Sequence, residues 1–302
     1  MFGNKSMTYK EKPAYGAMKR LRRKLLSIFK RWHRKGYDVR YVHINQKQYK
    51  KVIFRTESLA RRVHADLTAF GSSPHFPTVI GQHRNTVWVK FVQGQAIRRV
   101  DTSNLARLAD FYAAVYRRQY QLVAFRETTE WHDFYRDLAF LHDTELLSDR
   151  LYRELIAQSD EIVPAMVWRG FDYTDPITAN LLFREADGVV CAIDIKNLYS
   201  ETLIGRGVAK ARSRWLSDTL TESFFEQLLA KGAPDFRGYL PFLEILHQVT
   251  RAKGMILRGQ IRPLQPTALN QRLESLIRQA KAGSHPQRIR SLAESQRGEV
   301  RS

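Results

Sequence analysis

Three residues with oxygen-bearing side chains have the types and spacing to bind a metal ion: Asp175, Asn180 and Asp194. Asp175 and Asn180 lie in one polar loop, and Asp194 follows an apolar run further along the chain. Carboxylate and carboxamide oxygens are hard ligands, which Mg²⁺ prefers together with phosphate oxygens. The three side chains therefore predict a magnesium site, provided that the fold brings them together.

The residues between Asn180 and Asp194 predict a β-hairpin, the element that would position these side chains. An apolar strand at Leu181–Phe183 is followed by a turn at Glu185–Gly188 and a second apolar strand at Val189–Ile193. An Asp-Gly turn between two short strands is typical of a hairpin. Because a hairpin brings its open ends together, we expect the polar loop to lie beside Asp194.

The order Asp-x-x-x-x-Asn, hairpin, Asp resembles the catalytic core of the protein-kinase-like superfamily. The likeness is strongest to the aminoglycoside-phosphotransferase and lipopolysaccharide-core-kinase branches. The resemblance implies that Asp175 positions the attacking hydroxyl or accepts its proton. It also implies that Asn180 and Asp194 bind the Mg²⁺ that accompanies ATP.

The residues that flank this pattern depart from the family. Tyr173-Thr174 stand before the first Asp, where the family has His-Arg or His-Gly, and Ile195-Lys196 follow Asp194, where it has Phe-Gly. Asp172 is a rival for the role of the first Asp, but its spacing to Asn180 differs from the family's. The departures leave two interpretations open, an active phosphotransferase and a pseudokinase that keeps the fold as an interaction scaffold.

The stretch over residues 37–97 predicts the small lobe that the resemblance requires. Its elements occur in the order β-β-α-β-β, and this order was not used to find the hairpin. The β-branched and apolar runs predict strands, and the 3.6-residue spacing of apolar residues predicts the helix. The expected elements are Tyr37–Ile44, Tyr49–Arg55, the helix Glu57–Phe70 capped by Thr56, Thr78–Gly81 and Thr86–Val92.

The resemblance also implies which residues of this lobe bind the nucleotide. The second strand would carry the phosphate-binding cation, for which Lys51 is the first candidate and Arg55 the second. Strand alternation places both on one face. No glycine-rich phosphate loop is present. The segment after the last strand resembles the hinge that binds the adenine ring, with Phe91 and Gln93 as contacts and Gly94 allowing a change of direction.

From Thr102 onward the apolar spacing is mostly helical, which predicts a helical large lobe. The sequence thus predicts an α+β protein with a bilobal kinase-like fold. After Asp194 the chain is strongly basic, which suits an acceptor that already carries phosphate or, equally, a solvated helix face. The basic side chains are Arg206, Lys210, Arg212 and Arg214.

The net charge of +20 over 302 residues indicates an anionic partner. Residues 18–35 predict a basic amphipathic helix that could lie on an anionic membrane surface, follow a nucleic-acid backbone or pack on the domain. No nucleic-acid-binding motif is present. The single cysteine, Cys191, excludes an intramolecular disulfide and fits a reducing compartment.

These observations predict an ATP- and Mg²⁺-dependent phosphotransferase that acts on a hydroxyl of an anionic sugar or glycolipid, first of all a lipopolysaccharide-core sugar. We expect it in the cytoplasm, either free or peripherally bound at the inner face of the cytoplasmic membrane. The expected divisions are a basic arm and helix at 1–36, the small lobe at 37–97, the large lobe at 98–266 with the catalytic hairpin at 168–194, and a basic, partly disordered tail at 267–302.

Overall fold

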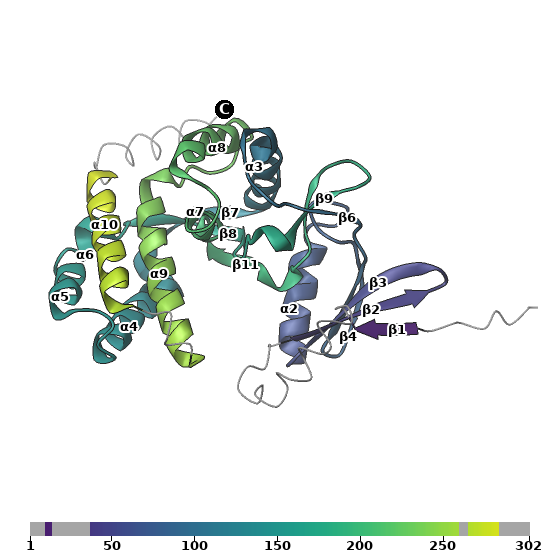
Figure 1. Cartoon of the computed structure of the whole chain (residues 1–302), viewed down its shortest axis with the longest axis horizontal. Coiled ribbons are helices and arrows are strands. Elements are labelled where there is room, and N and C mark those ends of the chain that lie inside the picture. Colours follow the sequence, from purple (N-terminus) through teal and green to yellow (C-terminus); the bar gives the residue numbers. More distant parts are fainter. Residues whose placement is uncertain (1–9, 14–36, 260–264, 284–302) are drawn as a thin grey trace, which may run out of the picture. The chain divides into compact units, whose positions relative to one another are not determined.

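The computed structural model describes residues 10–13, 37–259 and 265–283 (Figure 1). They form two compact units. The N-terminal unit combines the described residues up to 99 with 177–199, and the C-terminal unit combines 100–176 with the described residues from 200 on. The predicted helix at 18–35 lies outside the described residues.

The predicted catalytic hairpin at 168–194 is divided between the two units. Residues up to 176 belong to the C-terminal unit, whereas 177–199 belong to the N-terminal unit. The reason is strand pairing: the strand at Leu181–Arg184 pairs with Gly94–Ala96, which belongs to the N-terminal unit. The small lobe is therefore built from two separate stretches of sequence.

The N-terminal unit contains two antiparallel sheets. One has the strand order β1-β2-β3-β5-β4, and the other has the order β10-β9-β6. Residues 37–97 show the β-β-α-β-β order that the sequence predicts. The helices and strands of the whole N-terminal unit are β1 (Lys10–Pro13), β2 (Tyr37–Ile44), β3 (Lys47–Phe54), α2 (Glu57–Thr68), β4 (Val79–His83), β5 (Thr86–Lys90), β6 (Gly94–Ala96), β9 (Leu181–Arg184) and β10 (Val190–Ala192).

Helix α2 packs against the five-stranded sheet through its apolar face (Figure 1). Its buried residues include Ala60, Val63 and Leu67, which recur at helical spacing. The hydroxyl of Thr56 accepts a hydrogen bond from the Leu59 backbone N–H at 3.2 Å. This is the predicted N-cap, and it fixes where the helix begins.

The hairpin of β9 and β10 has the register expected from its sequence. Cys191 pairs with Leu182, and Gly188 in the turn has a φ of +66°, a left-handed conformation that favours glycine. On the other side of β9, a Cβ on Gly94 would lie 2.3 Å from the carbonyl oxygen of Phe183. Gly94 is thus required for close approach of two backbones.

The C-terminal unit is mostly helical, with one three-stranded sheet of order β11-β8-β7. Together with the small antiparallel sheets of the N-terminal unit, this confirms the predicted α+β fold class. The helices are α3 (Thr102–Tyr116), α4 (Thr129–Asp143), α5 (Asp149–Ala157), α6 (Ser159–Ile162), α7 (Arg206–Arg212), α8 (Asp218–Ala230), α9 (Leu240–Leu257) and α10 (Pro266–Gly283). The strands are β7 (Tyr120–Ala124), β8 (Met166–Tyr173) and β11 (Leu198–Leu203).

Aromatic side chains from α3, β8 and α8 fill the core of this unit. Tyr112 meets Phe111 edge-on with the ring centroids 5.1 Å apart, and Phe224 from α8 likewise at 5.8 Å. Phe111 meets Tyr173 at the end of β8 in the same way at 5.6 Å. Edge-to-face packing of this kind adds to the free energy of burial and favours one arrangement of the rings. The end of β8, where the polar loop begins, is therefore held by the core.

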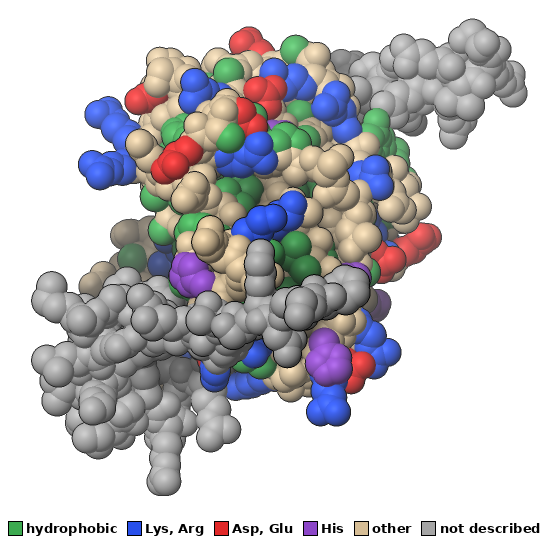
Figure 2. Space-filling model, turned by 90° about the vertical axis from the view of Figure 1, so that its right-hand side faces the viewer, with side chains coloured by type: hydrophobic (Ala, Val, Ile, Leu, Met, Phe, Trp, Pro, Cys, Tyr) green, Lys and Arg blue, Asp and Glu red, His purple; other side chains and the backbone are tan. Residues whose placement is uncertain are grey.

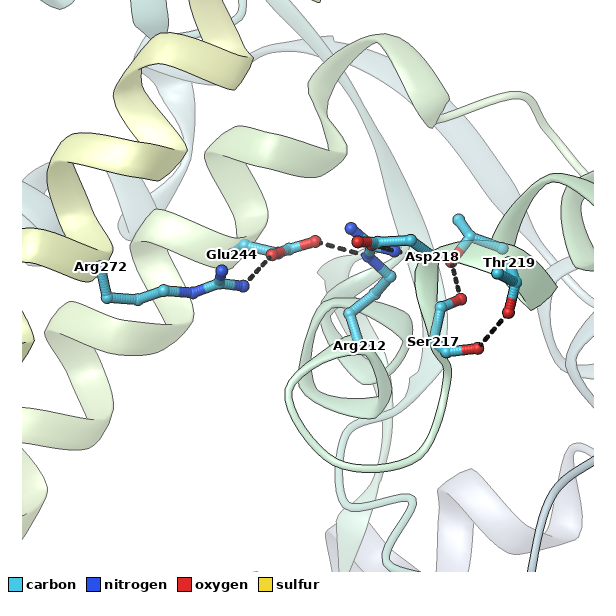
Figure 3. A network of polar contacts seen from close by, with 7 residues as sticks. Arg212, Ser217, Asp218, Thr219, Glu244 and Arg272 are labelled. Atoms are coloured by element: carbon cyan, nitrogen blue, oxygen red, sulfur yellow. Dashed lines mark hydrogen bonds and ion pairs between the residues drawn. The ribbon is translucent and has the colours of Figure 1, made fainter.

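A buried carboxylate ties four helices together (Figure 3). Glu244 on α9 accepts from Arg212 of α7 at 2.8 Å and from Arg272 of α10 at 3.1 Å. Arg212 also pairs with Asp218 of α8 at 2.5 Å. Helix α10, which begins at the predicted boundary of the tail, is thus part of the C-terminal unit. Within the described residues, no helix has the length and apolarity of a membrane span.

Candidate active site

The N-terminal unit brings two of the predicted site residues together. The backbone N–H of Ile193 donates to the carbonyl oxygen of Asn180 at 2.9 Å, so the residue before Asp194 is paired with Asn180 at the open end of the hairpin. One Asp194 carboxylate oxygen, Oδ2, accepts from Lys196 Nζ at 2.8 Å and from Asn197 Nδ2 at 2.9 Å. The carboxylate is largely buried and oriented by these two donors.

A second cation near this carboxylate, besides Lys196, is Lys50, which was not among the predicted site residues. Its ammonium donates to the carbonyl oxygen of Ile193 at 2.5 Å. Burial lowers the pKa of Lys50, while the charge of Asp194 acts in the opposite direction. A partly desolvated ammonium beside a carboxylate is suited to neutralise phosphate charge.

Of the predicted candidates, Lys51 lies on the other face of β3 and Arg55 follows the end of the strand. Lys51 Nζ lies 5.3 Å from the ring centroid of Trp88, and Arg55 is exposed. Because successive side chains of a strand alternate between its faces, Lys50 and Lys51 point to opposite sides of the sheet. The buried residues Val52 and Phe54 are two and four positions from Lys50, so they identify Lys50 as the inward-facing lysine. That alternation was visible in the sequence.

The two lysines provide a matched pair for a test of nucleotide binding. We expect Lys50→Met to raise the KM for ATP about tenfold to a hundredfold, because a charged contact contributes about 1.5–3 kcal/mol. Lys51→Met removes the same charge from the other face of β3 and should leave the KM nearly unchanged. Steady-state kinetics on both variants would measure this. If Lys51→Met raises the KM more than Lys50→Met does, Lys51 is the phosphate-binding lysine.

Helix α2 contacts the segment after Asp194 through an arginine. The Arg62 guanidinium donates to the carbonyl oxygens of Leu198 at 2.9 Å and Lys196 at 3.1 Å, and it pairs with Asp66 at 2.9 Å. Within the part of the chain that the structure describes, no acidic residue of α2 forms an ion pair with Lys50. The helix therefore contacts the segment after Asp194 through the backbone carbonyl oxygens of that segment.

The predicted hinge residues line a cavity of about 320 Å³ in the N-terminal unit. Phe91 and Gln93 form one part of the lining, Lys50 another, and Leu182 and Ile193 belong to the hairpin. The Gln93 carbonyl oxygen accepts from the Glu185 N–H at 3.2 Å. The volume lies in the range of small-molecule pockets, and the lining combines apolar side chains with two lysines, Lys50 and Lys90.

In the C-terminal unit, Asp175 forms an ion pair with Lys210 of α7. The adjoining loop is held by Trp215, whose indole Nε1–H donates to the Pro176 carbonyl oxygen at 2.6 Å. Asp175 is partly buried, and both of these contacts come from residues that follow it by more than thirty positions. Neither partner could be predicted from the sequence.

Asp172, the rival for the role of Asp175, is fully buried and has a structural task. Its carboxylate accepts from the Gly207 N–H at 2.8 Å and from the Tyr116 hydroxyl at 3.3 Å. A Cβ on Gly207 would lie 2.1 Å from the Tyr173 carbonyl oxygen, so only glycine allows this approach. Asp172 thus anchors the start of α7, the helix that carries Lys210.

The burial of Asp172 makes stability dependent on pH. Desolvation raises its pKa from 3.8 to about 7, although hydrogen bonds and Arg206 act in the opposite direction. Between about pH 4 and 7 the folded state holds a proton that the unfolded state releases, so stability falls as pH rises through this window. Three pKa units correspond to about 4 kcal/mol at most.

We expect Asp172→Asn to remove this pH dependence, because the carboxamide does not titrate and its oxygen still accepts from Gly207. The variant should therefore gain a few kcal/mol of stability relative to wild type between pH 5 and pH 8. Urea denaturation of both proteins at the two pH values measures the difference. If the stability difference between wild type and variant is the same at both pH values, Asp172 is already ionised at pH 5 in the folded protein.

The residues at the hairpin end suit a magnesium ion of the kind that accompanies a nucleotide. Within the described ranges no cluster of three or more His, Cys, Asp or Glu side chains could hold a metal by itself. A nucleotide-bound Mg²⁺ needs only one or two protein oxygens, because the phosphates supply others. Asp194 and Asn180 offer a carboxylate and a carboxamide oxygen, so the donor set fits.

The two units have the protein-kinase-like fold, as the comparison with solved structures shows. A macrolide 2'-phosphotransferase from Brachybacterium faecium superposes with a TM-score of 0.56 at 11% identity, over 87% of this chain and 97% of its own. Choline kinase from Streptococcus pneumoniae gives a TM-score of 0.56 at 10% identity, over 87% and 99%. No protein-family model and no curated protein sequence matches the chain.

An aminoglycoside phosphotransferase, solved with ADP and hygromycin B, gives a TM-score of 0.53 at 12% identity, over 82% of this chain and 91% of its own. Identities this low establish the fold alone. The activity must therefore be argued from the residues of this chain.

Proposed function

We propose that the protein is an ATP-dependent phosphotransferase that transfers a phosphoryl group to an alcohol. The observation that carries the proposal is the grouping of Lys50, Asn180 and Asp194 beside an apolar cavity within a kinase-like N-terminal unit. A cation, two oxygen ligands and a hydrophobic recess are the features that hold a nucleoside triphosphate.

In this proposal Asp175 orients the acceptor hydroxyl and takes up its proton as the oxygen attacks the γ-phosphorus. The bond from that phosphorus to the β,γ-bridging oxygen breaks, and ADP leaves. Lys50 neutralises phosphate charge, and the residues lining the cavity bind the adenine. Asn180 and Asp194 would hold Mg²⁺, which supplies charge stabilisation of the transferring phosphoryl group. Catalysis of this kind depends mostly on positioning.

For the acceptor we propose an anionic sugar or glycolipid, with a lipopolysaccharide-core sugar as the first compound to test. The net charge of +20 supports an anionic partner. The resemblance of the catalytic pattern to lipopolysaccharide-core kinases supports the sugar. Association with the inner face of the cytoplasmic membrane is part of the same proposal, and it depends on residues 18–35, which lie outside the described structure.

A pseudokinase is the second candidate, because both carboxylates have a cationic partner within the chain. Lys196 pairs with Asp194 at 2.8 Å, and Lys210 pairs with Asp175. If these contacts persist in the presence of nucleotide, the carboxylates are not available for metal binding or proton transfer. A nucleic-acid-binding role has less support. Figure 2 shows Lys and Arg side chains of the described residues interspersed with Asp and Glu on its visible face.

The proposal is tested by the thermal midpoint of the protein with ATP, with and without Mg²⁺. A ligand that binds the folded state raises the free energy of unfolding by mass action, by about 2.7 kcal/mol at a hundred times its Kd. This stabilisation raises the thermal midpoint. A rise that requires Mg²⁺, followed by transfer of the γ-phosphate to a sugar in an acceptor screen, is the expected result. ATP binding without transfer to any acceptor would favour the pseudokinase.

A further inference from the structure

A second cavity, of about 510 Å³, lies wholly within the C-terminal unit between α7, α9 and the end of β8. Five of its lining residues are cationic, and none of the described residues that line it is acidic. Thr174, the neighbour of Asp175, also lines it. The cations are Arg206, Lys210, Arg214, Arg251 and Arg258.

Two of these cations have no carboxylate partner among the residues that the structure describes. Arg206 pairs with Glu130 at 3.5 Å, and Lys210 pairs with Asp175. Arg214 and Arg251, by contrast, form no ion pair with any described residue, although both border the same cavity. Guanidinium groups at such a position are suited to bind a phosphate through paired N–H donors.

His247 on α9 adds an unsatisfied polar atom to the same lining. Its Nε2 is buried and has no hydrogen-bond partner among the described residues. Burial lowers the pKa of His247 to about 4, and Lys210, Arg251, Arg214 and Arg206 act in the same direction. The imidazole is therefore neutral at pH 7. A buried polar atom without a partner costs free energy, which a ligand oxygen at Nε2–H would recover.

We propose that this cavity binds the phosphomonoester group of a phosphorylated sugar and so selects the acceptor of the phosphotransferase. The inference rests on the proposed function, since it assigns a binding site to that reaction's acceptor. The volume accommodates a monosaccharide phosphate. The charge of the lining opposes a cationic acceptor such as choline.

Lys210 connects this cavity to the catalytic carboxylate. Its ammonium lines the cavity and is also the partner of Asp175. A phosphate in the cavity competes with Asp175 for this ammonium, and so it frees the carboxylate for the acceptor hydroxyl. An acceptor without the phosphate leaves Asp175 paired. The phosphate should therefore raise kcat as well as lower KM, which binding affinity alone would not do.

The test compares glucose 6-phosphate, glucuronate and glucose by titration calorimetry, without nucleotide. We expect glucose 6-phosphate to bind most tightly. Arg214→Gln and Arg251→Gln should each weaken it roughly tenfold to a hundredfold. Both arginines are exposed, so the variants should fold. Arg153→Gln removes the same charge from exposed α5, away from the cavity, and serves as the matched control.

Vesicles carrying phosphatidylinositol 4-phosphate present the same chemistry, a phosphomonoester on a polyhydroxylated ring, on a lipid. Tighter binding to these than to the free sugar phosphate, lost in Arg251→Gln, would identify a lipid-linked acceptor and support the same site. Equal binding of glucose and glucose 6-phosphate, or equal loss in Arg153→Gln, would overturn the proposal. Tighter binding of glucuronate would overturn the assignment to phosphate.

Failure of the proposed function gives a different pattern. If the protein does not bind ATP but binds glucose 6-phosphate through Arg214 and Arg251, the cavity is an anion site and the phosphotransferase proposal falls. If ATP raises the thermal midpoint but glucose 6-phosphate binds no more tightly than glucose, the proposed phosphotransferase activity is supported. The assignment of this cavity to the acceptor phosphate is then wrong.

Discussion

Replacing Asp194 by alanine is expected to abolish turnover, with kcat/KM reduced at least about 10³-fold, or some 4 kcal/mol of transition-state stabilisation. The reason is that Asp194 places a carboxylate at the open end of the hairpin in the N-terminal unit, next to Ile193, whose backbone contacts both Lys50 and Asn180. The Mg²⁺-dependent part of the ATP-induced rise in thermal midpoint should disappear in the same variant.

Asp187 is the matched control for Asp194, because it lies in the turn of the same hairpin. Its carboxylate pairs with Arg184 and accepts from the Val189 N–H at 3.1 Å. We expect Asp187→Ala to keep its activity within about threefold of wild type, since surface ion pairs contribute little. Equal losses in the two variants would mean that the hairpin fold, and not the Asp194 carboxylate, is what activity requires.

Asp175→Asn should lower kcat by about 10² to 10⁴, the range in which a positioned general base contributes. Binding of Mg²⁺ and ATP should persist, because the proposed ligands Asn180 and Asp194 belong to the other unit. Single-turnover transfer to the acceptor and the ATP-induced thermal shift, measured on the same preparation, separate the two effects. Loss of ATP binding together with turnover would contradict the assigned role.

Asp172→Asn decides between the two candidate aspartates. Because its carboxylate is buried and already bonded to Gly207 and Tyr116, we expect this variant to lose less than about tenfold in kcat, as the carboxamide oxygen retains the contact with Gly207. A loss as large as that of Asp175→Asn would assign the proton transfer to Asp172.

The features that could be predicted from the sequence are those that depend on local pattern. The Asp-Gly turn predicted the hairpin of β9 and β10, and the Thr56 cap predicted the start of α2. Apolar spacing predicted the order of elements over residues 37–97. These features depend on turn chemistry and side-chain periodicity within a short stretch.

What could not be predicted depends on contacts between distant residues. The partner of Asp175 is Lys210, and the partner of Lys50 is a backbone oxygen at Ile193. The basic residues after Asp194 were equally compatible with a solvated helix face. Only the position of α9, which places His247 and Arg251 on the same cavity, shows that these cations share a recess.

The discontinuous N-terminal unit has a consequence for how the chain folds during synthesis. Its second sheet needs β9 and β10, which leave the ribosome about 80 residues after β6. Until then the edge of β6 lacks the strand that satisfies its backbone groups, and Lys50 lacks the carbonyl of Ile193. Domains that are contiguous in sequence can fold as they emerge. Here the N-terminal unit must wait until residue 199 is made, so it is completed only after all of the intervening residues of the C-terminal unit, 100–176, have been synthesised.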